Sequence, residues 1–108
     1  MGTIQAECGQ FFFVRLESGA QVYKVVAWSE NESGGLDPLC NLVAMFDGNS
    51  SEPQWTLHSS SASSYRYCNT GRPFLHFVTY FKCDGGLEDL YHSINKIAKV
   101  WDVPEIIL

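Results

Sequence analysis

The chain has 108 residues, of which 45% are hydrophobic and 14% aromatic, so it has enough apolar material for a folded core and is not a disordered chain. Twelve acidic and seven basic residues give a formal net charge of −5, and the basic residues are scattered along the sequence. This pattern argues against nucleic acid and anionic membrane as partners, because both are bound by clustered Lys and Arg.

Targeting and redox signals favour an intracellular, cytoplasmic protein. The first ten residues lack the basic region of a signal peptide, and no apolar run approaches the roughly 20 residues of a membrane span. Cys8, Cys40, Cys68 and Cys83 are an even number that would permit disulfides in a secreted chain. Cys40 and Cys68, however, lie inside strand-like runs, where free cysteine behaves as a small hydrophobe. We therefore expect reduced thiols.

Strand-like segments fill most of the chain before residue 83. The first nine residues are either a disordered lead or an edge strand. Aromatic and β-branched runs separated by glycine, proline and serine turns then predict six strands. These are Gln10–Leu16, Gln21–Trp28, Leu39–Phe46, Gln54–His58, Tyr65–Cys68 and Phe74–Lys82. Pro38 is expected to end the third strand on its N-terminal side, because proline cannot donate in a ladder.

The last element is one amphipathic helix. Its apolar residues recur at i, i+3, i+4 and i+7, which places them on one face. They are Leu87, Leu90, Tyr91, Ile94, Ile97, Ala98 and Trp101. Asp84 or Gly86 can cap its start, and Asp102-Val103-Pro104 stops it. We predict that the helix packs on the sheet face that carries Phe77 and Phe81, and that the apolar tail after Pro104 docks nearby.

These elements predict one α+β domain, residues 1–108, with an antiparallel sheet or bent barrel of about six strands followed by a C-terminal helix. The element order is similar to that of the pleckstrin-homology superfold, in which a terminal helix closes a bent sheet or barrel. We find no internal repeat and no linker that would indicate a second domain.

Catalytic and metal-binding patterns are weak. No Cys or His pair has the close spacing of a zinc site, and no cysteine has an activating neighbour in the sequence. Gly85-Gly86 before the helix resembles a phosphate loop, but Asp84, Glu88 and Asp89 would repel an anion. We therefore predict no catalytic residue, no metal and no cofactor, and favour a protein that is not an enzyme.

Alternation in the predicted strands makes both faces of the sheet apolar, and one helix can cover only one of them. The other face must either line a closed interior or meet another chain. Aromatic residues interleaved with Lys24, His76 and Lys82 favour an interface. The predicted binding residues are Trp28, His76 and Tyr80, with a second candidate surface at Trp55, Tyr65 and Tyr67.

The leading hypothesis is a non-enzymatic module that binds a protein or peptide through this second face or a strand edge, with a homodimer as one form of it. The alternative is a small-molecule-binding or enzymatic β-barrel whose aromatics line an internal pocket.

Overall fold

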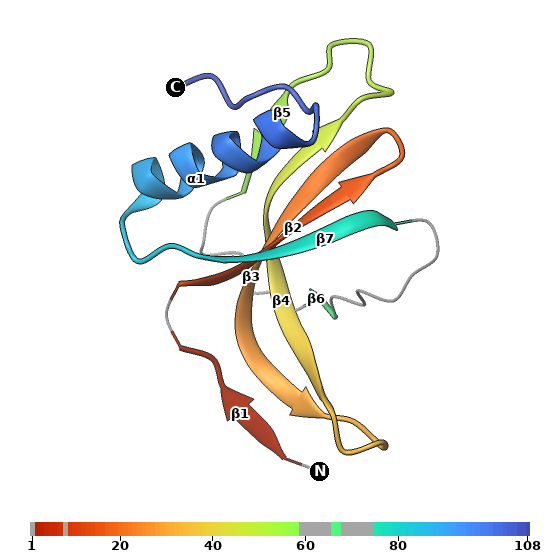
Figure 1. Ribbon diagram of the computed structural model, residues 1–108, viewed down its shortest axis with the longest axis vertical. Coiled ribbons are helices and arrows are strands. Elements are labelled where there is room, and N and C mark those ends of the chain that lie inside the picture. The colour runs from red at the N-terminus through yellow and green to blue at the C-terminus, as the bar shows by residue number, and fades with distance from the viewer. Residues whose placement is uncertain (1, 8, 59–65, 68–74) are drawn as a thin grey trace.

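A computed structural model describes residues 2–7, 9–58, 66–67 and 75–108 of the chain. In this part of the chain an antiparallel sheet is followed by one helix, so the predicted α+β class is confirmed (Figure 1). The strands are β1 Thr3–Gln5, β2 Gln10–Leu16, β3 Gly19–Glu30, β4 Leu36–Asp47, β5 Trp55–Leu57, β6 Arg66–Tyr67 and β7 Leu75–Lys82, and the helix is α1 Leu87–Val100.

A long twisted hairpin of β3 and β4 is the spine of the sheet (Figure 1). The strand order is β5-β4-β3-β2-β7, with β1 also paired to β3 and β6 also paired to β4. Each spine strand therefore has two shorter strands laid end to end along its outer side. The described strands form an open sheet, in which no pairing joins β5 to β7.

The observed strand boundaries agree with the sequence prediction in β2 and differ from it in β3 and β4. The prediction for β2 is confirmed residue for residue, whereas β3 and β4 extend two and three residues further than expected at the hairpin that joins them. The expectation that Pro38 ends its strand is wrong, because Pro38 lies inside β4 opposite Trp28. At this point β4 pairs only with β3 among the described residues, so the missing N–H can face the unpaired side.

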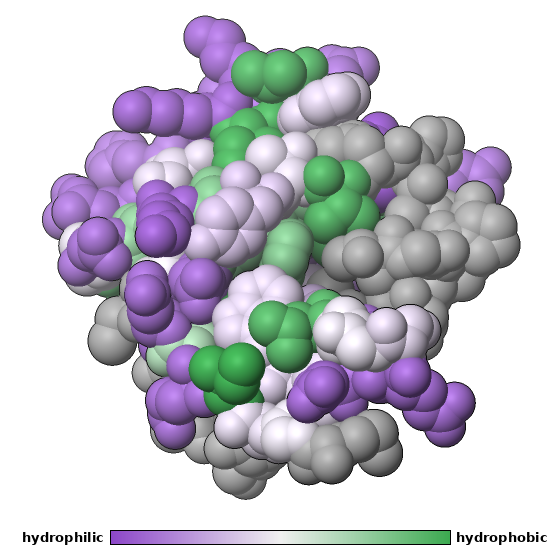
Figure 2. All heavy atoms as spheres, turned by 60° about the horizontal axis from the view of Figure 1, so that its bottom comes forward, coloured by the Kyte–Doolittle hydropathy of each residue, from purple (hydrophilic) through white to green (hydrophobic). Residues whose placement is uncertain are grey.

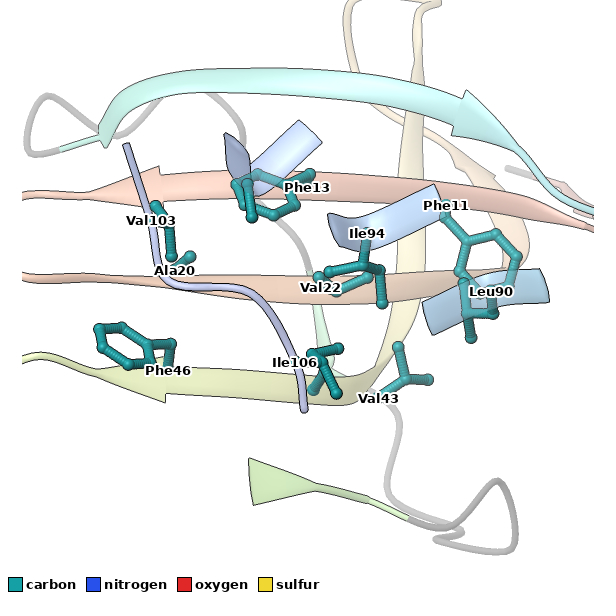
Figure 3. Close-up of a cluster of buried hydrophobic side chains, with 12 residues drawn as sticks. Phe11, Phe13, Ala20, Val22, Val43, Phe46, Leu90, Ile94, Val103 and Ile106 are labelled. Atoms are coloured by element: carbon teal, nitrogen blue, oxygen red, sulfur yellow. The ribbon is translucent and has the colours of Figure 1, made fainter. Parts of the chain in front are cut away.

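The main core lies between α1, the C-terminal tail and one face of the sheet, here called the helix face (Figure 3). Its buried residues come from β2, β3, β4, α1 and the tail, and they are Phe11, Phe13, Ala20, Val22, Val43, Ala44, Phe46, Leu90, Ile94, Ala98, Val103 and Ile106. Phe81 packs against this cluster, as predicted. The side chain of Phe77 lies outside the described part.

The helix packs on the sheet through side chains of its central turns. Leu90, Ile94 and Ala98 are buried, and Gly86 occupies the predicted N-cap position. Two residues of the predicted apolar face, Leu87 and Trp101, lie at the two ends of the helix and are 61% and 43% exposed. Arg15 fixes the C-terminal end, because its Nε donates a hydrogen bond to the Trp101 carbonyl (3.3 Å).

The C-terminal tail is anchored by paired hydrogen bonds, which confirms that it docks. The Asn95 Nδ2 donates to the Ile106 carbonyl (3.0 Å), and the Ile106 N–H donates to Asn95 Oδ1 (2.6 Å). Ile106 is thereby held in the core, while Ile107 remains in solvent.

Among the described residues, no helix has the length and apolar character that crossing a membrane requires.

Candidate functional site

The sheet face opposite the helix, here called the second face, also carries apolar side chains. In the strand register Phe12 lies opposite both Tyr23 and Tyr80, and Val14 lies opposite Val78. Residues that face each other in an antiparallel pair point to the same side of the sheet. Val14 is buried there, Phe12 is half-buried and Tyr80 is exposed. No described helix covers this face.

A bulge in β3 brings Trp28 onto the second face. Val25 pairs with Cys40, but the next pair is Ala27 with Leu39, so one residue of β3 is skipped. This extra residue reverses the alternation, and Trp28 packs with Val25 and Cys40 in a second apolar cluster. Simple alternation placed Lys24 and Trp28 on the same face, and that prediction is wrong.

Three aromatic rings, Phe12, Trp28 and Tyr80, form a contiguous group on the second face, here called the aromatic cluster. The Phe12 ring meets Tyr80 edge-on with centroids 5.5 Å apart, and it meets Trp28 edge-on at 6.3 Å. Gln10 links the polar ends of the other two rings: its Nε2 donates to the Tyr80 hydroxyl (3.1 Å), and Trp28 Nε1 donates to its Oε1 (3.3 Å). The cluster therefore holds Tyr80 in a fixed position although 42% of its surface is exposed.

Exposed apolar groups continue beyond the aromatic cluster. Ile4 lies opposite Trp28 in the β1–β3 pair and is exposed. Figure 2 shows that, on the side of the molecule turned to the viewer, green apolar and pale residues meet across the middle, with purple hydrophilic residues flanking them. This clustering of aromatic residues with polar neighbours is typical of protein interfaces.

The strand β7 lies at one end of the strand order, so its outer side is an edge of the described sheet (Figure 3). This edge adjoins the aromatic cluster because Tyr80 belongs to β7. The Cys83 N–H donates to the Gly9 carbonyl at 2.9 Å, next to the register pair Gln10–Lys82. Since hydrogen-bonding directions alternate along a strand, Phe81 and Thr79 also point their N–H and C=O groups toward β2. The N–H and C=O groups of Val78, Tyr80 and Lys82 therefore point to the outer edge, where no described strand pairs with them.

Three further predicted binding residues have side chains outside the described part of the structure. Tyr65 lies outside the described residues. Tyr67 belongs to β6 and His76 to β7, and their side chains are outside the described part.

Trp55 faces the helix side rather than the second face. Its ring lies 6.3 Å from that of Phe13 and 5.9 Å from that of Phe46, and its Nε1 donates to the Pro104 carbonyl at 2.7 Å. The indole therefore connects β5 to the C-terminal tail.

Trp55→Phe is expected to keep the ring contacts and remove this hydrogen bond. We expect a loss of about 1 kcal/mol in the free energy of unfolding, measured by urea denaturation. A change within experimental error would show that the bond to Pro104 does not stabilise the tail.

The His, Cys, Asp and Glu side chains in the described part of the chain do not form a second candidate site. No three His, Cys, Asp or Glu side chains among the described residues are grouped so that they could hold a metal ion. Cys40 is buried in the second apolar cluster, and Cys83 is a half-buried free thiol.

Comparison of the chain with protein-family models, with curated proteins and with solved structures gave no match.

Proposed function

We propose that this chain is a protein-interaction module that binds an extended segment of a partner along the outer edge of β7, next to the aromatic cluster. The observation that carries the proposal is the row of outward-pointing backbone groups at Val78, Tyr80 and Lys82 beside the exposed Tyr80 ring. Strand addition uses such an edge for affinity and adjacent side chains for specificity.

The composition of this edge supports strand addition. Natural proteins protect long edge strands with proline, bulges or charged side chains, lysine above all. From Val78 to Lys82, β7 contains no proline, pairs with β2 without a register shift, and has a single charged residue at its end. A bound strand would extend the sheet and place one of its side chains beside Tyr80.

The open sheet gives less support to the alternative of an aromatic-lined barrel interior. A partner segment can come from another protein or from a second copy of β7. Light scattering across a concentration range separates these two cases, because only self-association makes the measured mass rise with concentration.

Tyr80→Ala is the variant that tests the proposal. Peptides selected from a random library on the intact protein supply the ligand, and the Kd of the best peptide is then measured by calorimetry. We expect Tyr80→Ala to weaken binding, or self-association if the protein dimerises, by about 2 kcal/mol, as for an aromatic hot spot. Leu57→Ala is the matched control, because Leu57 is equally exposed (43%) but lies on β5 at the opposite edge.

Amide hydrogen exchange gives a second readout of the same proposal. Binding should slow exchange at Val78, Tyr80 and Lys82, while Thr79 and Phe81 are already protected by β2. If Tyr80→Ala destabilised the fold without weakening binding, or if protection appeared elsewhere, the proposed edge would not be the binding site.

A further inference from the structure

A cleft of about 290 Å³ lies on the other side of the sheet, between the helix face and the start of α1. Apolar side chains from β2, β4 and α1 form much of its lining: Phe11, Val43, Leu87, Leu90 and Tyr91. Four polar side chains and three glycines complete the lining: Lys24, His58, Cys83, Asp84, Gly9, Gly85 and Gly86. The cleft shares no residue with the aromatic cluster or with the outward-pointing positions of β7.

Lys24 distinguishes this cleft from an ordinary gap in packing. It lies opposite Phe11 in the β2–β3 pair, so it projects on the helix face, and it is half-buried. Among the described residues it forms no ion pair, whereas Lys82 on the second face pairs with Glu7 at 3.8 Å. This unpaired ammonium group is available to form a charge-assisted hydrogen bond with an anion bound in the cleft.

We propose that the cleft binds a small monocarboxylate with an apolar body. The apolar body would pack against Phe11, Leu90 and Tyr91, and the carboxylate would accept a charge-assisted hydrogen bond from the Lys24 ammonium. His58, at the same cleft, can donate a second hydrogen bond through its imidazole N–H.

The charges around the cleft restrict the ligand to one negative charge. Asp84 lines the cleft, and Glu88 and Asp89 follow in the first helical turn. A phosphate would bring about two negative charges close to these carboxylates. A monocarboxylate brings only one negative charge, which the single positive charge of Lys24 can match.

The test uses phenylpropanoate and its neutral amide as probes in NMR titrations of the full chain. Saturable binding of the acid is expected at millimolar concentration or tighter, with shifts at the amides of Phe11, Leu90 and Tyr91. The neutral amide should bind about tenfold more weakly, since a hydrogen bond to a charged group is lost.

Variants assign the effect to Lys24. Lys24→Met should weaken binding of the acid about tenfold and leave binding of the amide unchanged. Lys82→Met is the matched control on the second face and should have no effect. Lys24→Arg keeps the charge and should retain the preference for the acid over the amide. If Lys24→Met does not fold, Lys24→Arg is the variant whose binding of the two probes is measured.

The proposal is overturned if the acid and the amide bind equally, if Lys24→Met leaves acid binding intact, or if neither probe saturates at low millimolar concentration. Shifts confined to Val78 and Tyr80 would also overturn it, because they would place the ligand at the edge of β7.

Discussion

Ile94→Ala is expected to lower the free energy of unfolding by about 2 to 5 kcal/mol, the range for truncating a well-packed core side chain. Ile94 is 0% exposed and lies at the centre of the main core, over Val22 and between Phe11 and Ile106 (Figure 3). The loss combines the transfer free energy of the deleted carbons with the cavity that they leave, because strands on a hydrogen-bonded sheet can collapse only partly.

Ile107→Ala is the control for this prediction. Ile107 is the same residue type and lies in the docked tail, but it is 96% exposed. Its truncation should change stability by no more than about 0.5 kcal/mol, as expected for a surface site. Urea denaturation of both variants gives the comparison. A loss below about 0.5 kcal/mol for Ile94→Ala as well would mean that α1 is not docked on the sheet as described.

The sequence predicted the helix and its buried centre because helical periodicity is a local property. Leu90, Ile94 and Ala98 follow one another at intervals of four residues, so they face the sheet together. Leu87 and Trp101 follow the same period but lie at the two ends of the helix, where they are exposed. Periodicity specifies which side of a helix is apolar, but the extent of the opposing surface decides how much of that side is buried.

The candidate site was only partly predictable, and the bulge in β3 is the main reason. Alternation correctly separated Phe12 from Phe11 on β2. On β3 it grouped Lys24 with Trp28, whereas the skipped residue between Val25 and Ala27 places them on opposite faces. No residue type in Val25-Val26-Ala27 signals a bulge, since the segment contains no glycine, the residue that marks one common bulge type.

The edge position of β7 was also beyond local reasoning. The sequence identified residues 74–82 as the longest apolar strand, which would usually suggest a central position. In the structure β7 pairs with the side of β2 that faces away from β3, so β7 extends the β2–β3–β4 meander at its first strand. Strand order depends on pairing between residues about 70 positions apart, such as Gln10 and Lys82. A local pattern carries no information on such pairs.

Gly9→Ala is expected to lower the free energy of unfolding by about 2 to 5 kcal/mol through two separate causes. Gly9 has φ +82°, a left-handed conformation that an L-residue adopts only at a cost. A Cβ at this position would also lie 2.6 Å from the Cys83 carbonyl oxygen and 2.4 Å from Asp84 Oδ1. The backbone cannot retreat without weakening the hydrogen bond from Cys83 N–H to the Gly9 carbonyl.

Gly34→Ala separates the two causes. Gly34 has the same φ of +82°, but a Cβ added there would meet nothing within 4 Å. It should cost only the backbone strain, about 1 to 2 kcal/mol, so the difference between the variants measures the steric contact with β7. Urea denaturation gives the two losses, and amide exchange of Cys83 reports directly on the affected bond. Equal losses with unchanged Cys83 protection would contradict a close approach of Gly9 to β7. We expect the larger loss of unfolding free energy at Gly9 because the close contact between Gly9 and Cys83 joins the start of β2 to the end of β7. Both residues also line the cleft.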